Sequence, residues 1–278
     1  MAKKKRDIRK EFLEKEIHLP EYEPDSGGET IALVYPNNYK IGMSSLAYLT
    51  VYRHLIEDGF RPERFFLDIH DSKLKPISIE KGTSLNSFSK IAFHFSFELD
   101  YINAISMLIA SGIEHDRKSR RKRKGAFLVA GGICPTTNPL PVMDFFDAVY
   151  VGELDQRTLT ILKGGGFDNK LKDAEETGWL VFDDSSVDIT GITVKQHVCP
   201  DWQEYASFSP IITPNAVFGM MNLIEISRGC PVRCKFCLAG NLHKNVREKS
   251  SDLIVDSALL LGDITKQVGL IGAIPSAH

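Results

Sequence analysis

A repeated alternation of short apolar runs with amphipathic segments restricts residues 31–163 to one class of fold. Five runs are almost continuously apolar, as in strands buried on both faces: 31–35, 64–67, 90–95, 126–130 and 147–151. Between them apolar residues recur at helical spacing, which predicts helices over 42–56, over a stretch with Tyr101, Ile102, Ile105, Leu108 and Ile109 on one face, and over 153–163. This order predicts an α/β fold with a doubly wound parallel sheet.

Polar residues and glycines follow the expected strands, at the edge where such a sheet binds its ligands. They are Asn37, Asn38, Ser96, Gly131, Gly132, Gly152 and Glu153. The pair Gly131-Gly132 lets the backbone approach a ligand closely, which a side chain would block. We therefore expect a ligand site at this edge of the sheet, with Ser96, Gly131 and Gly132 in it.

Three of the five cysteines lie in one short run, Ser227-Arg-Gly-Cys-Pro-Val-Arg-Cys-Lys-Phe-Cys237. The spacing Cys-x3-Cys-x2-Cys allows the thiolates of Cys230, Cys234 and Cys237 to point at one centre. Zinc sites and ferredoxin-type clusters usually have four protein ligands, whereas three suit an iron–sulfur cluster with one iron left open. Zinc stays an alternative, with His243 as the nearby candidate for a fourth ligand. Cys134 and Cys199 are isolated in the sequence, and we expect ordinary buried or loop thiols there.

A strand–loop–helix–strand pattern surrounds these cysteines. Residues 222–227 form an apolar stretch rich in branched side chains, and the cysteine run follows directly, where barrel enzymes place their chemistry. A helix is expected over 253–261, with Ser250 or Ser251 as its N-cap, and a second strand over 268–274. The pattern predicts the first one to two βα units of a TIM-type barrel.

The cysteine run resembles the radical S-adenosylmethionine (radical SAM) enzymes. The resemblance implies that Cys230, Cys234 and Cys237 hold a 4Fe-4S cluster whose free iron binds S-adenosylmethionine. It also implies that Phe236 lies against the adenine and that Gly272 contacts the amino group at the end of the second barrel strand. One electron, from a reductant such as flavodoxin or ferredoxin, then yields a 5'-deoxyadenosyl radical in the full-length protein, with an unknown substrate.

The first half resembles the cobalamin-binding domain that precedes the barrel in one large branch of this family. The segments that carry the resemblance are 34–44, 93–98 and 129–132, and they are closest to an uncharacterised group of that branch. It implies a possible cobalamin near Ser96, Gly131 and Gly132, linked to methyl transfer. Cobalamin domains with a histidine on cobalt carry Asp-x-His-x-x-Gly, whereas here Asp68-Ile-His70 is followed by Lys73, so we expect no role for His70. His94 is expected to be a core histidine, and the domain could also bind nothing.

The predicted organisation has four parts: a basic tail over 1–27, the cobalamin-binding-like domain over 28–165, a linker over 166–220 and the barrel start over 221–278. Only 41 residues follow Cys237, which is too short for a whole barrel, so we expect a truncated barrel that is not a complete catalyst. We also expect residues 28–165 to fold stably, and the segment after Met221 to be poorly ordered or to pair with another copy.

Composition is that of an ordinary cytoplasmic globular protein, with 43% hydrophobic and 25% charged residues and no apolar run long enough to span a membrane. A basic run over 117–124 is expected to be an unstructured surface connection, so nucleic-acid binding is unfavoured but open. Two alternative functions therefore remain. They are an RNA-modifying radical enzyme, which would need further cluster cysteines, and a non-catalytic binding module.

Overall fold

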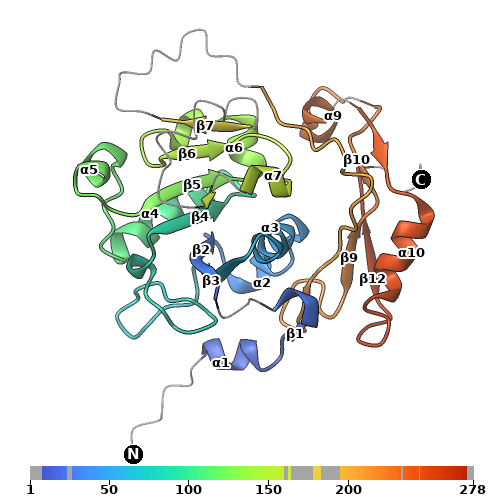
Figure 1. Ribbon diagram of the computed structural model, residues 1–278, viewed down its shortest axis with the longest axis horizontal. Helices are drawn as coiled ribbons and strands as arrows, with labels where there is room; N and C mark the ends of the chain where they lie inside the picture. Colours follow the sequence, from blue (N-terminus) through green and yellow to red (C-terminus); the bar gives the residue numbers. More distant parts are fainter. Residues whose placement is uncertain are drawn as a thin grey trace, which may run out of the picture.

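The computed structural model describes residues 8–23, 27–159, 162–163, 178–182, 195–232, 234–243 and 245–273. A six-stranded sheet forms the centre of its first unit, the part of the chain that precedes the cysteine-bearing segment (Figure 1). The strand order is β3-β2-β4-β5-β6-β7. The bounds are β2 Glu29–Tyr35, β3 Phe60–Phe66, β4 Lys90–His94, β5 Phe127–Gly131, β6 Ala148–Tyr150 and β7 Trp179–Val181. The first five are parallel, and β7 runs antiparallel to β6. The predicted parallel sheet is confirmed, and its order switches between β2 and β4, where doubly wound folds bind ligands.

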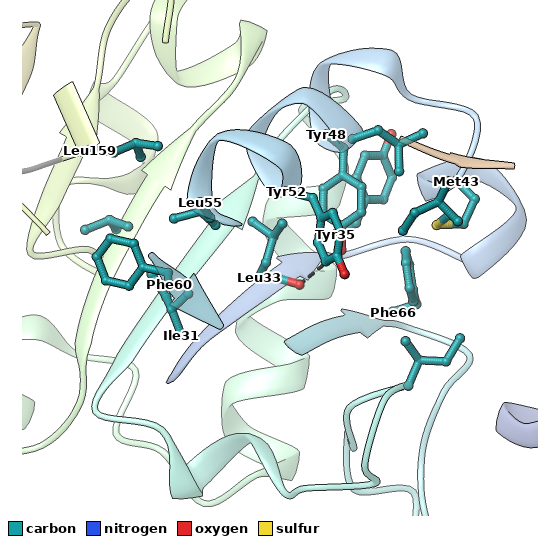
Figure 2. Packing of buried hydrophobic residues seen from close by; sticks show 14 of the residues in the cluster. Ile31, Leu33, Tyr35, Met43, Tyr48, Tyr52, Leu55, Phe60, Phe66 and Leu159 are labelled. Atoms are coloured by element: carbon teal, nitrogen blue, oxygen red, sulfur yellow. Dashed lines mark hydrogen bonds between the residues drawn. The ribbon is translucent and has the colours of Figure 1, made fainter. Parts of the chain in front are cut away.

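Helices cover both faces of this sheet, and each face has its own apolar core. The helices are α2 Tyr39–Gly42, α3 Leu46–Glu57, α4 Asp100–Ala110, α5 Arg117–Lys122, α6 Ile133–Thr137 and α7 Gln156–Leu159, with short 3-10 turns η2 Leu85–Ser87 and η3 Leu140–Val142. Figure 2 shows α3 on one face, where the Tyr48 hydroxyl donates a 3.1 Å hydrogen bond to the Leu33 carbonyl. On the other face, α4 buries Ala104, Met107 and Leu108.

Residues 8–23 are part of the fold and not a tail. They form α1 Ile8–Leu13, β1 Ile17–His18 and η1 Pro20–Tyr22, while residues 1–7 lie outside the described ranges. The ring of Phe12 stacks on Tyr39 at 4.2 Å, and the carboxylate of Glu16 lies 2.6 Å from buried Arg64. The prediction of a basic tail over 1–27 was therefore wrong for residues 8–23, because their contacts are made with distant residues.

Two expectations about helices need correction. The basic run over 117–124 is mostly helix α5, and its Arg120 is buried against Asp147 at 2.9 Å, so it is no unstructured connection. On α4, Ile102 and Ile109 are exposed, because the buried stripe is shifted around the helix from the predicted one. The helix predicted over 153–163 is described only as the short α7, since residues 160 and 161 lie outside the described ranges.

The region predicted as a linker over 166–220 contributes strands where it is described. β7 completes the central sheet, and β8 Ile211–Ile212 pairs antiparallel with β1. The linker prediction was wrong for these two segments, which are too short to show a clear period in the sequence. No helix within the described residues is long and apolar enough to cross a membrane.

The cysteine-bearing segment folds as one strand–helix–strand unit beside the first domain (Figure 1). Its elements are β9 Asn222–Glu225, β10 Ser227–Arg228, α9 Leu238–Leu242, β11 Arg247–Glu248, α10 Ser251–Leu259 and β12 Val268–Ile271. β12 pairs parallel with β9, as predicted for a barrel start, and Ser250 is the N-cap of α10. A small apolar cluster joins Ile224, Ile226 and Leu261 of this segment to Leu19 and Phe208. The segment thus has a packing partner within the chain.

Candidate functional site

A cavity of about 370 Å³ lies between the sheet and the cysteine-bearing segment. One wall comes from α3 and includes Leu46, Ala47, Thr50, Val51 and Leu55. A second wall comes from the sheet and the loops that follow its strands, and includes His94, Ser96, Gly131, Gly132, Thr136, Gly152 and Glu153. The third wall comes from the cysteine-bearing segment, with Glu225, Arg228, Leu242, His243 and Ile271. Both units are therefore needed to form this cavity.

The strand-end residues predicted from sequence meet on the cavity wall. Ser96, Gly131 and Gly132 all line it. Gly132 has a φ of 103°, and a Cβ there would lie 2.4 Å from the Phe95 carbonyl oxygen, so only glycine fits. A Cβ at Gly131 would meet nothing closer than the Tyr150 Cβ at 3.8 Å. Gly131 thus keeps room on the wall, while Gly132 fixes the turn.

His94, which the sequence predicted to be a core histidine, also lines the cavity. Its side chain lies at the end of β4, on the face that α3 covers, and stacks on the ring of Tyr35 at 5.8 Å. Burial lowers the pKa of this imidazole to about 4, so it is neutral at pH 7. A neutral imidazole can both donate and accept a hydrogen bond, and can also bind a metal.

Glu153 joins the first unit to the cysteine-bearing segment through three basic side chains. Its carboxylate lies 3.4 Å from Arg228, 3.3 Å from His243, and also pairs with Arg247. The backbone N–H of Cys199 donates to it at 3.1 Å. Burial alone would raise the pKa of Glu153, but these partners hold it at about 2, so the group is a carboxylate at any ordinary pH. The sequence placed Glu153 at the ligand edge, but could not reveal its partners.

A second group of contacts surrounds Trp202, which the sequence reading did not single out. The indole ring is faced by Arg228 at 4.8 Å, Arg247 at 5.2 Å and Lys249 at 4.0 Å. Its N–H donates to Glu225 at 3.3 Å. Burial lowers the pKa of Lys249 to about 8. Cations over an aromatic ring are stabilised most where water is excluded, so Trp202 supports Arg228 and Arg247, which also pair with Glu153.

The three cysteines lie on one loop but do not form a finished metal site. Cys230 is buried, whereas Cys234 and Cys237 are half-buried and joined by a turn in which the Cys237 N–H donates to the Cys234 carbonyl at 3.0 Å. The Asn241 side-chain amide donates to the backbone carbonyls of both Cys234 and Cys237. Among the described residues, no three His, Cys, Asp or Glu side chains are arranged to hold a metal ion. The donor set suits an iron–sulfur cluster chemically, although the three thiols do not converge on one point among the described residues.

Of the other predicted residues, Phe236, Gly272 and His70 do not line the cavity, whereas His243 does. Phe236 is 93% exposed, and Gly272 lies against the side chain of Ser227, where a Cβ would come within 2.3 Å of its hydroxyl. His70 is exposed and its ring hydrogen-bonds the Asp71 carbonyl, away from the cavity walls. His243 contacts Glu153, so the residue considered for zinc has another partner.

Comparison with known proteins agrees with this architecture. Residues 50–175 match the family model described as "Radical SAM proteins, N-terminal". This part of the chain is similar to the N-terminal domain of radical SAM proteins. The uncharacterised protein MJ0966 of Methanocaldococcus jannaschii is 28% identical over 224 residues, which cover 81% of this chain and 44% of that protein.

A solved structure shares the fold of nearly the whole chain. It is the cobalamin-dependent S-adenosylmethionine radical enzyme OxsB with aqua-cobalamin bound, with a TM-score of 0.53 and 17% sequence identity. The match covers 90% of this chain and 35% of that one. The chain therefore spans less than half the length of either protein, and at this identity the likeness to OxsB concerns the fold.

Proposed function

We propose that this chain is part of a radical SAM protein in which the cavity holds a corrinoid and Cys230, Cys234 and Cys237 hold a 4Fe-4S cluster. The observation that carries the proposal is the cavity itself, whose walls come from both the radical SAM N-terminal domain and the cysteine-bearing segment. A ligand in it would therefore lie beside the cysteine loop. The substrate and the reaction, including methyl transfer, belong to the whole protein and stay open.

The walls suit a large ligand with apolar surface and a few polar groups. The cavity volume of about 370 Å³ lies within the usual range for small-molecule sites, and the wall formed by α3 is mainly apolar. Hydroxyls of Thr50, Ser96 and Thr136 and the neutral imidazole of His94 supply hydrogen-bonding groups. A corrinoid is larger than this cavity, so we propose that it is partly enclosed and also covers the strand ends.

When bound, a 4Fe-4S cluster with S-adenosylmethionine supplies a carbon-centred radical. The residues of this chain would hold the thiolates and exclude water from the cavity. Because the three thiols are not convergent among the described residues, cluster binding must draw Cys234 and Cys237 towards buried Cys230. We propose that the turn from Cys234 to Cys237, which Asn241 braces, moves as one piece.

The corrinoid part of the proposal is tested by titrating aquacobalamin into the chain and into two variants at one glycine. Gly131→Ala should bind within about twofold of the parent, since the cavity wall has room for a methyl group. Gly131→Leu should bind at least about tenfold more weakly, because its side chain fills the cavity. Equal binding by all three proteins would contradict a corrinoid in this cavity.

The cluster part is tested by anaerobic reconstitution with iron and sulfide. We expect about four irons for each chain, an electron paramagnetic resonance signal in the reduced state, and loss of both in Cys234→Ala. Stoichiometric zinc, or a signal unchanged in Cys234→Ala, would contradict the assignment.

A second candidate is a corrinoid-binding module without a cluster, and the non-convergent thiols favour it. It predicts normal aquacobalamin binding together with no stable iron uptake. The RNA-modifying alternative loses support, because the basic run is mostly helix and buries Arg117 and Arg120.

A further inference from the structure

We infer that Glu153 is a positioning residue that closes the base of the cysteine loop by neutralising two arginines that face each other there. The inference concerns this chain without any cofactor, so it does not depend on the proposed function. It would make the first domain a working part of the cysteine site and not only its neighbour.

The cysteine loop is closed at its base by a short antiparallel ladder. β10 enters the loop and β11 leaves it, and all three cysteines lie between these strands. The ladder pairs Ser227 with Glu248 and Arg228 directly with Arg247. Like charges directly opposite each other on a sheet destabilise it, so this ladder needs a counter-charge.

Glu153 supplies that counter-charge from the first unit. Its buried carboxylate contacts both arginines at once, and contacts His243 at the far end of the loop. Glu225 also binds Arg228, at 2.8 and 2.7 Å, but no contact of Glu225 with Arg247 is present among the described residues. Glu153 is thus the carboxylate that bridges the two strands.

A tight backbone approach makes the loop sensitive to this ladder. Gly229, between Arg228 and Cys230, has a φ of 92°, and a Cβ there would lie 2.5 Å from the Asn245 carbonyl oxygen. The two ends of the loop are therefore in contact immediately beside Cys230, which is itself buried. If the arginines separate, this contact opens and Cys230 becomes accessible.

The test measures how fast Cys230 reacts with N-ethylmaleimide in the full chain, which is reduced first, freed of reductant and kept anaerobic, with peptide mass spectrometry to separate the cysteines. In Glu153→Gln we expect the alkylation of Cys230 to accelerate by about tenfold or more, because a local opening exposes it. Buried Cys134, in the first unit, serves as an internal control and should keep its slow rate. Equal acceleration at Cys134 would indicate global unfolding and overturn the inference.

Asp147→Asn is the matched control variant. Asp147 directly precedes β6, whereas Glu153 follows that strand, and both side chains are buried. Asp147, however, pairs with Arg120 and Arg121, which belong to the first unit. Its loss should not accelerate Cys230 selectively. A selective acceleration like that of Glu153→Gln would contradict a specific role for Glu153.

A further variant tests whether Glu153 acts through its charge or through a general structural role. It removes the repulsion between Arg228 and Arg247 without restoring Glu153. Adding Arg247→Gln to Glu153→Gln should return the Cys230 rate most of the way to that of the parent, because the opposed pair no longer carries two charges. Arg247→Gln alone should stay protected, which keeps the test usable if Glu153→Gln does not fold. A double variant that reacts as fast as Glu153→Gln, or a fast Arg247→Gln, would overturn the inference.

Discussion

The two units of this chain are stabilised in different ways. The first unit has two large apolar cores, one on each face of a six-stranded sheet. The cysteine-bearing segment has one small apolar cluster, and it keeps several large apolar side chains exposed on α10 and β12, among them Leu259 and Leu270. Beyond this cluster, its attachment relies on Glu153 and on the basic side chains around Trp202.

This difference has a consequence for function. Apolar burial is non-directional and makes the first unit a stable support. Ion pairs between units depend on geometry and charge, so the position of the cysteine segment is set by where its basic side chains can meet buried Glu153. The base of the cysteine loop is therefore held by a directional contact to the first unit.

The largest effect should come from a buried ion pair inside the first unit. Arg64 is fully buried and pairs with Glu16 at 2.6 Å and Glu80 at 2.5 Å. Arg64→Met leaves the buried carboxylate of Glu16 and the partly buried one of Glu80 without their cation, and should lower the free energy of unfolding by about 3–5 kcal/mol. Urea unfolding measures this, with exposed Arg123→Met as the control. A loss below about 1 kcal/mol would show that this unit does not depend on the pair.

The second effect concerns pH and His94. Its pKa falls from 6.5 to about 4 in the folded protein, so the unfolded state binds a proton first as the pH drops. The free energy of unfolding that His94 contributes is fully present above about pH 6.5. It should decline by about 3 kcal/mol in total as the pH falls from 6.5 to 4. Unfolding free energies at pH 7, 5.5 and 4 should fall less steeply in His94→Phe. Identical slopes in the two proteins would contradict a neutral buried imidazole.

The smallest effect should come from the cap of α10 in the cysteine segment. The Ser250 hydroxyl accepts from the Leu253 N–H at 3.3 Å, and the sequence alone left Ser250 and Ser251 equally possible. Ser250→Ala should cost about 1 kcal/mol, seen as faster proteolysis of this segment, while Ser251→Ala should change little. A larger effect of Ser251→Ala would show that Ser250 is not the N-cap of α10.

Much of the fold could be predicted because its signals are local. The runs at 31–35, 90–95 and 126–130 are almost continuously apolar, as buried parallel strands are, and all three form neighbouring strands. The same logic placed Ser96, Gly131 and Gly132 at one edge. What the sequence could not indicate were contacts between distant residues. α1 was missed because its support, such as Phe12 against Tyr39, comes from elsewhere in the chain.

The candidate site shows the same limit. The cysteine spacing is a local pattern and was visible at once, whereas the pairing of Glu153 with Arg247 joins residues 94 positions apart. Arg120 illustrates the error that follows, since a run of basic residues reads as a solvated loop unless the buried partner Asp147 is known.

The central claim is that one cavity is shared by both units, and amide hydrogen exchange with and without aquacobalamin tests it most directly. The account predicts slower exchange on binding in two places: around Ser96 and Gly131-Gly132 in the first unit, and over residues 225–243 in the cysteine-bearing segment. Protection confined to the first unit, or spread evenly over the chain, would contradict a cavity formed by both.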